Sequence, residues 1–173
     1  MRNIELSIVV AMTPSWVIGT SGTIPWRIPS DLRRFKRITM AFGNVIVGRK
    51  TWESIPQTYR PLPNRHSIIV SRGGYVPTES GSLEVVTSVE EALMSVRARG
   101  GRAGVIGGEE IYRLFLPLTR TIHVTMVYAN VVGDAHFPQV DRNEWEGVSG
   151  ERNLKEAGDE YRTSFLTYRR KQK

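Results

Sequence analysis

Asp31 is the residue in this sequence whose type and neighbours most directly suggest chemistry. It is the only acidic residue between Glu5 and Glu53. At about 100° per residue, a helix would place it on the same face as Phe35 and Ile38. A carboxylate at the head of such an apolar face can accept two parallel hydrogen bonds from an N–C–N group of a ligand. We therefore predict that Asp31 is a ligand anchor, with a pKa raised by its apolar surroundings.

The position of Asp31 also has a purely structural interpretation. Pro29 and Ser30 mark the start of a helix, and an acidic residue in the first turn is favoured by the helix dipole by roughly 0.3–1 kcal/mol. The two interpretations differ in what the carboxylate needs. An anchor needs a donor-rich or cationic ligand, because an unpaired buried charge is costly, whereas the helix-dipole role needs none.

Three turns follow apolar strands, and these turns contain glycines or carry hydroxyl or cationic side chains. Such turns suit an anion, because free backbone N–H groups and basic side chains meet there, and paired glycines allow close approach to the backbone. In open α/β sheets, ligands bind where the strands end. We therefore predict a phosphate-binding edge, with Thr51 capping the helix that follows the first turn. The turn residues are Gly48, Arg49, Lys50 and Thr51; Ser71 and Arg72; and Gly107 and Gly108.

The elements that must position these residues alternate between strand and helix. Apolar runs rich in Val and Ile are typical of strands buried on both faces of a mostly parallel sheet. We predict strands at residues 6–12, 45–47, 67–70, 104–106 and 122–128. Helices are predicted at residues 30–42, from near residue 51, from Ser88 with a capping box completed by Glu91, and at residues 109–116 before Pro117.

The C-terminal region follows a different pattern. Residues 161–169 alternate in strand fashion after a polar, turn-rich stretch, and we predict an antiparallel strand there beside residues 122–128. The predicted fold class is therefore α/β: a single domain over residues 1–173. Its central, twisted, mostly parallel sheet has an antiparallel C-terminal strand and is flanked by about four helices.

Composition narrows the classes of function. With 40% hydrophobic and 24% charged residues, and no apolar run long enough to span a membrane, we expect a cytoplasmic globular protein. We expect no signal peptide, no disulfide because the chain has no cysteine, and no metal site because the three histidines lack ligand spacing. The net charge of +7 allows a polyanionic partner, but aromatic residues are not interleaved with the basic ones, and no nucleic-acid partner is expected.

The order of these motifs resembles the dihydrofolate reductase family from about residue 6 to residue 168. A chance match to all of them at this spacing is very improbable, whereas no G-x-G-x-x-G or P-loop sequence is present. The motifs are Val17-Ile18-Gly19 with Ile24-Pro25-Trp26; Pro29-Ser30-Asp31-Leu32 with Phe35-Lys36; Gly48-Arg49-Lys50-Thr51-Trp52-Glu53-Ser54-Ile55; Arg60-Pro61-Leu62-Pro63; Val105-Ile106-Gly107-Gly108 with Tyr112; and Gly133-Asp134 before His136-Phe137-Pro138.

The resemblance implies a substrate, dihydrofolate, and a set of residues that bind it. Asp31 would hold the 2-amino group and adjacent ring nitrogen of the pterin, with Thr125 joining through water and Trp26 helping to hold a water nearby. Arg65 would pair with the glutamate carboxylate of the substrate, although Asn64 stands where glycine is common, a turn position that asparagine tolerates. The side chains implied to sandwich the pterin and aminobenzoyl groups are Val9, Val10, Leu32, Phe35, Ile55 and Leu62.

The resemblance also implies the cofactor, NADPH, and its binding residues. Residues 16–25 would form a mobile loop over the nicotinamide, with Ile24 nearest the ring in place of the more usual methionine or leucine. Gly107 and Gly108 would meet the pyrophosphate and nicotinamide, beside Tyr112. Arg49, Lys50, Thr51, Ser71 and Arg72 would bind the phosphates, and further cofactor contacts are implied at Ala11, Ile18, Gly19, Gly48 and Ile106.

The reaction implied is hydride transfer from NADPH to dihydrofolate, with N5 protonated through water. The resemblance further implies antifolate inhibitors as ligands and a monomer. Three alternatives remain at this point. They are a related reductase that acts on a ribosylaminopyrimidine, a nucleic-acid-binding protein suggested by the charge, and a family member that binds folates with little turnover. The first lacks the Pro-x-Asp-Leu helix start of this chain, and the second leaves Asp31 and the glycine turns unexplained.

Overall fold

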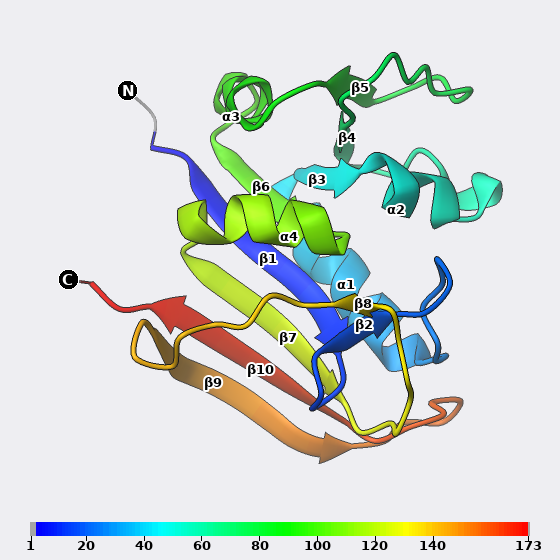
Figure 1. Ribbon diagram of the computed structural model, residues 1–173, viewed down its shortest axis with the longest axis vertical. Coiled ribbons are helices and arrows are strands. Elements are labelled where there is room, and N and C mark those ends of the chain that lie inside the picture. Colours follow the sequence, from blue (N-terminus) through cyan, green and yellow to red (C-terminus); the bar gives the residue numbers. More distant parts are fainter. Residues whose placement is uncertain (1–2, 173) are drawn as a thin grey trace.

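Residues 3–172 are described by the computed structural model, in which a twisted eight-stranded sheet is covered on both faces by helices (Figure 1). The strands of the sheet are β1 (Glu5–Met12), β3 (Asn44–Gly48), β4 (His66–Val70), β5 (Leu83–Val86), β6 (Arg102–Val105), β7 (Thr121–Val127), β9 (Trp145–Leu154) and β10 (Thr163–Arg170). Two short strands, β2 (Val17–Gly19) and β8 (Ala135–His136), pair with each other outside it.

The sheet has the order β5-β4-β3-β6-β1-β7-β10-β9. All pairs from β5 to β7 are parallel, and β10 is antiparallel to both β7 and β9. The central strands are buried on both faces, which explains their continuous apolar sequence. The strand order brings the C-terminal ends of β4, β3, β6, β1 and β7 to one edge, and the predicted functional turns follow there.

Helices lie on both sides of this sheet. Helix α1 (Pro29–Phe42) and the short α2 (Arg49–Ser54) pack on one apolar cluster, through side chains such as Phe35 and Trp52. On the other face, α3 (Val89–Ala98) and α4 (Glu109–Phe115) pack on a second cluster through Val96 and Phe115. The 3-10 turns η1 (Gln57–Tyr59) and η2 (Leu116–Leu118) extend the loops after α2 and α4.

The predicted fold class is confirmed, with boundaries that shift by one or two residues. The predicted C-terminal antiparallel strand is β10, and it pairs with β7 as expected. Ser88 caps α3, accepting a hydrogen bond from the Glu91 N–H at 3.1 Å. Thr51 does not cap α2, because the helix begins at Arg49 after Gly48. That prediction was wrong because the turn after β3 is tighter than the sequence suggests.

Four strands were not predicted: β2, β5, β8 and β9. Strand β9 forms the edge of the sheet, and most of its described residues are exposed, so it lacks the apolar pattern that marks the inner strands. Strands β2 and β8 are short and pair only with each other. Within residues 3–172, no helix is long and apolar enough to cross a membrane, and no group of three metal-ligating side chains is found.

Candidate active site

Asp31 lies in the first turn of α1, facing the C-terminal end of β7. The hydroxyl of Thr125, a buried residue of β7, donates a hydrogen bond to the Asp31 carboxylate with an oxygen–oxygen distance of 2.5 Å. The resemblance implies that Thr125 joins the network of Asp31 and the pterin through water, and the structure adds a direct bond between the two side chains. The residues lie 94 positions apart and are brought together because α1 crosses the sheet beside β1.

Burial is the largest influence on the Asp31 carboxyl and raises its pKa, as the sequence predicted. The hydrogen bond from Thr125 and the positive charge of Arg34 act in the opposite direction, while the negative charge of Asp159 raises the pKa further. The net direction is upward. A ligand that donates two hydrogen bonds to this carboxylate would offset the cost of keeping it charged.

The apolar side chains predicted to sandwich the pterin come from four segments. Val9 of β1 and Leu62 of the loop after η1 are buried in one cluster, and Phe35 and Ile55 pack against it. Leu32 is 61% exposed, so its side chain is available to a ligand. These side chains lie on the α1 side of the sheet, the side that Asp31 faces.

Val10 does not belong to this apolar wall, which consists of the side chains of Val9, Leu32, Phe35, Ile55 and Leu62. Its side chain packs in the cluster on the opposite face of the sheet, with Tyr112 and Phe137. Successive residues of a strand point to opposite faces, so Val9 and Val10 cannot both contact the same ligand through their side chains. The expectation that the Val10 side chain joins the sandwich was wrong.

Arg65 is buried at the start of β4, with its guanidinium held in place. Its Nε–H donates to the Pro63 carbonyl and its Nη1 donates to the Thr39 hydroxyl, both at 3.0 Å. Burial lowers the pKa of Arg65, although a guanidinium remains charged in proteins. Asn64 adopts φ +58°, which confirms the left-handed turn expected there. Two of the five N–H donors are thus used to orient a fork that suits a carboxylate.

The three predicted phosphate-binding turns follow neighbouring strands, β4, β3 and β6. The backbone N–H of Gly48 donates to the Gly107 carbonyl at 2.7 Å and joins two of these turns directly. A cavity of about 420 Å³ opens between the turns after β3 and β4 and the start of α4. It is lined by Gly48, Arg49, Lys50, Val70, Ser71, Arg72, Gly73, Tyr75, Glu110 and Ile111.

The glycine pair after β6 is closely packed against neighbouring side chains. Gly107 has φ +114°, a left-handed conformation that favours glycine, and a Cβ there would lie 3.2 Å from the Tyr112 ring. The Gly107–Gly108 peptide bond is cis. A Cβ on Gly108 would lie 2.8 Å from the Thr51 hydroxyl. Tyr112 donates from its hydroxyl to the Val9 carbonyl at 2.9 Å, which ties the turn to β1.

The cations at this edge are exposed and paired with acidic side chains. Arg49 contacts Glu53 at 3.0 Å within α2, and Arg72 contacts Glu110 of α4 at 3.0 Å. The Arg72 side chain is 83% exposed. Surface pairs of this kind contribute little to stability, so an anionic ligand can replace the carboxylates at small cost.

The predicted loop at residues 16–25 is fastened to the segment around β8. The Asp134 carboxylate accepts from the Ser21 N–H at 3.0 and 3.1 Å, and the Phe137 N–H donates to the Trp16 carbonyl at 2.8 Å. Ile18 and Gly19 lie in β2, which pairs with β8. The loop carries Ile24 at 63% exposure.

Trp26 and Ala11 lie at the base of this loop. Both pack against a small apolar cluster around Ile28 and Val127, at the C-terminal ends of β1 and β7. Trp26 is therefore near the Asp31 helix start, which is where a water-holding side chain was expected. Ile106 is buried directly before the glycine pair, among the residues that pack beneath α1.

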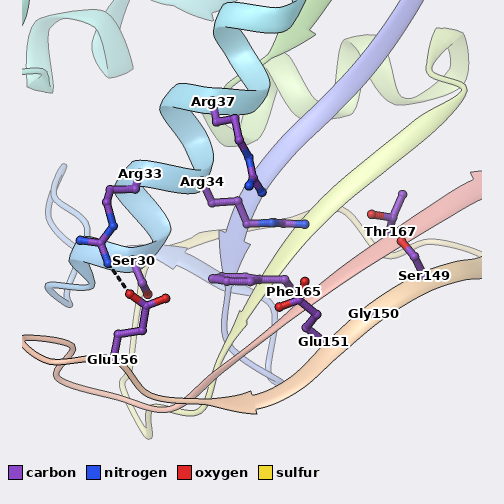
Figure 2. A pocket seen from close by; sticks show the side chains of 10 residues that line it. All are labelled: Ser30, Arg33, Arg34, Arg37, Ser149, Gly150, Glu151, Glu156, Phe165 and Thr167. Atoms are coloured by element: carbon purple, nitrogen blue, oxygen red, sulfur yellow. Dashed lines mark hydrogen bonds and ion pairs between the residues drawn. The ribbon is translucent and has the colours of Figure 1, made fainter.

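A second cavity, of about 580 Å³, lies on the far side of α1, between this helix and strands β9 and β10 (Figure 2). Its lining does not include the predicted sandwich residues. Figure 2 shows Arg34 extending over the ring of Phe165, while Arg33 turns toward Glu156, with which it forms an ion pair. The guanidinium carbon of Arg34 lies 4.5 Å from the ring centre.

Sequence reasoning missed three side chains that shape the site. Arg34 contacts Thr125, Asp159 holds the start of α1 through Ser30, and Tyr75 lines the cavity between the turns. Arg34 lies three residues after Asp31, a spacing that places both on one side of a helix. That spacing was the available signal. Asp159 had none, because it lies 129 positions from Ser30.

Comparisons with known proteins agree with this architecture. A family model described as dihydrofolate reductase matches residues 5–170. The chain is 35% identical over 166 residues to the dihydrofolate reductase of Bacillus subtilis strain 168, covering 96% of this chain and 95% of that protein. It is 39% identical over 160 residues to that of Mycobacterium leprae strain TN, covering 91% and 94%.

Among solved structures, a dihydrofolate reductase from Enterococcus faecalis complexed with NADP(H) and RAB-propyl has the same fold. The TM-score is 0.84 at 29% sequence identity, and the match covers 97% of each chain. The match therefore includes both the Asp31 region and the glycine turns.

Proposed function

We propose, from the premise that this chain belongs to the dihydrofolate reductase family, that Asp31 anchors the pterin of dihydrofolate. The chain is an enzyme that reduces 7,8-dihydrofolate to 5,6,7,8-tetrahydrofolate with NADPH. The observation that carries the proposal for Asp31 is its direct hydrogen bond with Thr125 at the C-terminal ends of β1 and β7. This pair is the acceptor site beside the apolar wall of Val9 and Phe35.

In the proposed site, each end of dihydrofolate meets a different kind of residue. The two oxygens of Asp31 accept from the 2-amino group and the adjacent ring nitrogen of the pterin. Val9, Leu32, Phe35, Ile55 and Leu62 contact the rings, and Arg65 takes the glutamate carboxylate with the donors that face away from Pro63 and Thr39. A dihydrofolate molecule held at both ends loses most of its freedom before the reaction, and this positioning is the main contribution that a protein makes to hydride transfer.

The cofactor fits the edge formed by the three turns. Arg49, Lys50, Ser71 and Arg72 line the cavity of about 420 Å³ and offer positive charge and hydroxyl donors for phosphates. The missing Cβ atoms of Gly107 and Gly108 make room for the Tyr112 ring and the Thr51 hydroxyl, and in the proposed complex the backbone of this turn meets the pyrophosphate and nicotinamide. When bound, NADPH supplies the hydride that C6 of the pterin receives.

Protonation of N5 requires a proton donor that reaches the pterin. Asp31 holds the opposite edge of the ring, so we propose that water, held near Trp26 and the exposed loop around Ile24, delivers this proton. Burial raises the pKa of the Asp31 carboxyl, so this carboxyl binds a proton more readily than an exposed aspartate does. Closure of the loop through Asp134 and Ser21 excludes other water from the ring.

The remaining parts of the proposal concern the state and the other ligands of the protein. We propose a cytoplasmic monomer, because the resemblance extends over nearly the whole chain to a single-domain enzyme. We also propose that antifolates carrying a 2,4-diaminopyrimidine bind at Asp31, since such a ring presents the same N–C–N edge as the pterin.

The experiment that tests the proposed function is NADPH oxidation by the purified protein on addition of dihydrofolate, with NADH in a parallel reaction. We expect rapid, dihydrofolate-dependent loss of NADPH absorbance and much slower loss of NADH absorbance. If folded protein binds NADPH but dihydrofolate produces no oxidation, the proposed substrate is wrong. If NADH serves equally well, the proposal that Arg49 and Arg72 bind the 2′-phosphate, the group that distinguishes NADPH from NADH, is wrong.

A further inference from the structure

We propose that Arg34 is a positioning residue for the pterin-binding carboxylate, because it holds the Thr125 hydroxyl in the orientation that donates to Asp31. This inference rests on the proposed function of Asp31 and assigns to that site a residue outside the pterin wall. Arg34 hydrogen-bonds to Thr125, which in turn hydrogen-bonds to Asp31, and the Arg34 side chain lines the cavity between α1, β9 and β10. Arg34 therefore acts on the carboxylate through neighbouring protein groups and not through contact with the ligand.

Two neighbouring strands hold the guanidinium of Arg34. Thr125 of β7 and Phe165 of β10 are direct partners in the antiparallel register. Arg34 contacts both: its Nη1 lies 3.3 Å from the Thr125 hydroxyl oxygen, and its guanidinium carbon lies 4.5 Å from the centre of the Phe165 ring. Figure 2 shows Arg34 lying over Phe165. A guanidinium over an aromatic face is attracted by the ring quadrupole. The side chain is thus fixed by contacts from two strands.

The chemistry of the three groups determines where the Thr125 proton points. A guanidinium has only donors, so Thr125 must accept from Arg34. The hydroxyl has a single proton, which it donates to the carboxylate of Asp31 at 2.5 Å. Protonation of Asp31 on its other oxygen would leave this bond in place but with a neutral acceptor, and a hydroxyl bonds more strongly to a charged carboxylate than to a neutral carboxyl. The arrangement therefore favours the ionised carboxylate, the form that accepts two hydrogen bonds from a pterin.

The charges around Asp31, Thr125 and Arg34 shift the pKa of the Asp31 carboxyl in opposite directions. Toward Asp31, Arg34 lowers the pKa and Asp159 from the β9–β10 loop raises it. Toward Arg34, Arg37 of α1 and Glu151 of β9 contribute opposite charges. His123 of β7 also faces the guanidinium, and burial together with the charge of Arg34 lowers the pKa of this histidine. Removing Arg34 is therefore expected to raise the pKa of both Asp31 and His123.

The test compares Arg34→Met with Arg33→Met. Arg33 is the adjacent arginine of the same helix, 61% exposed and paired with Glu156 away from Thr125. The probe is a 2,4-diaminopyrimidine antifolate, whose affinity is measured by calorimetry from acidic to weakly alkaline pH. We expect Arg34→Met to weaken binding on the order of tenfold at acidic pH and less at neutral pH. The reason is that the acidic limb of the binding profile, the pH range in which affinity falls on acidification, begins at higher pH in this variant. Arg33→Met is expected to follow the wild-type profile.

A double-mutant cycle with Thr125→Val shows whether Arg34 acts through the hydroxyl. The effect of Arg34→Met on the acidic limb should shrink in the Thr125→Val background, since the bond that Arg34 orients is then absent. An undiminished effect in that background overturns the proposal. So does an equal loss of affinity at every pH, which would indicate packing alone. The NMR titration of His123 gives an independent reading, and an unchanged His123 pKa in Arg34→Met also counts against the proposal.

The same titrations separate this inference from the function on which it rests. Asp31→Asn, measured in parallel, should lose both affinity and the acidic limb. If Asp31→Asn binds the antifolate as the wild type does, the anchor role of Asp31 fails. If Asp31→Asn loses affinity while Arg34→Met matches Arg33→Met, only the role of Arg34 fails. Thermal melts of each variant confirm that the comparison is made between folded proteins.

Discussion

The two ends of the candidate site bind charge in opposite ways. At the pterin end, one partly buried carboxylate, Asp31, is held by a buried hydroxyl and has a raised pKa. At the phosphate end, exposed cations stand on glycine-rich turns, and two of them, Arg49 and Arg72, are paired with acidic side chains. A single buried charge has no substitute when it is lost, whereas exposed charges share their task and are screened by salt.

This contrast explains why the two ends use different parts of the fold. The carboxylate needs a rigid surrounding, which α1, β7 and the capping residue Asp159 provide. Asp159 accepts from the Ser30 N–H at 3.1 Å and from the Ser30 hydroxyl at 2.7 Å, next to Asp31 in the chain. The phosphate end needs backbone N–H groups and space, which the turns after β3, β4 and β6 provide. The largest and most pH-dependent effects are therefore expected at the pterin end.

The largest effect is expected from Asp31→Asn. The amide keeps the shape of the side chain but loses the negative charge and one of the acceptors that face the pterin. We expect dihydrofolate turnover at neutral pH to fall about 100- to 1000-fold, because each hydrogen bond to a charged group contributes about 1.5–3 kcal/mol. Steady-state kinetics with NADPH measure this, and circular dichroism confirms the fold. Near-wild-type turnover in this variant would mean that Asp31 does not anchor the pterin.

A smaller effect is expected from Gly107→Ala at the phosphate end. The φ of +114° disfavours alanine, and its Cβ would lie 3.2 Å from the Tyr112 ring. We expect the free energy of unfolding to fall by about 2 kcal/mol and NADPH affinity to fall about tenfold. Chemical denaturation measures the first and fluorescence titration the second.

Gly73→Ala provides the control for stability. A Cβ on this glycine would meet no atom within 4 Å beyond its own chain neighbours, and its φ is not positive, so the substitution should leave unfolding unchanged. Equal destabilisation by the two alanines would mean that the backbone at Gly107 is not the constrained feature of this edge.

The exposed cations should give weaker and salt-dependent effects. For Arg72→Gln we expect about a fivefold reduction in the preference for NADPH over NADH, because one of several solvent-screened contacts is lost. The effect should diminish as salt increases. Arg113→Gln is the matched control, since Arg113 is also exposed and paired, with Glu109, but does not line the cavity. A large loss of NADPH preference in Arg72→Gln that does not change with salt would show that the contact of Arg72 with the cofactor is not screened by solvent, contrary to what its exposure suggests.

The smallest expected effects are on stability, and they differ in sign between two neighbouring carboxyls. The pKa of Asp159 is lowered in the folded protein by hydrogen bonds from Ser30 and Glu156, against the opposing effect of burial. Its contribution is therefore present above the unfolded-state pKa and is lost as pH falls through the folded-state pKa. The pKa of Asp31 is raised, chiefly by burial. Ionising it costs stability as pH rises from the unfolded-state pKa through the folded-state pKa.

Replacing each of these carboxyls by an amide should reveal the difference. At neutral pH we expect Asp159→Asn to lower, and Asp31→Asn to raise, the unfolding free energy of the ligand-free protein by about 1 kcal/mol. Both differences should shrink toward acidic pH. Thermal melts across this range measure them, and shifts of the same sign in the two variants would contradict the assigned pKa directions.

The sequence was informative where a local pattern carries the structure. Apolar runs located the inner strands, and the residues that follow β3, β4 and β6 were expected at one edge, where the structure places them. Asp31 was identified because it heads an apolar helix face. Thr125 was found only through the resemblance, since no local pattern connects it to a residue 94 positions away.

The remaining features depend on tertiary contacts that leave no local pattern. Arg34 looks like one basic residue among several in α1 until the structure places Thr125 and Phe165 beneath it. Strand β9 is polar because it lies at the edge of the sheet. Val10 was misassigned because two adjacent apolar residues of a fully buried strand do not reveal which face each side chain occupies.

The central claim is that one buried carboxylate serves the pterin and a separate set of exposed cations serves the cofactor. Calorimetric titration of Asp31→Asn and Arg72→Gln with NADPH and, separately, with a 2,4-diaminopyrimidine antifolate tests it most directly. We expect Asp31→Asn to lose antifolate affinity on the order of 100-fold while its NADPH affinity stays within about twofold, and Arg72→Gln to lose only NADPH affinity. Loss of both affinities in Asp31→Asn, or of neither, would contradict it.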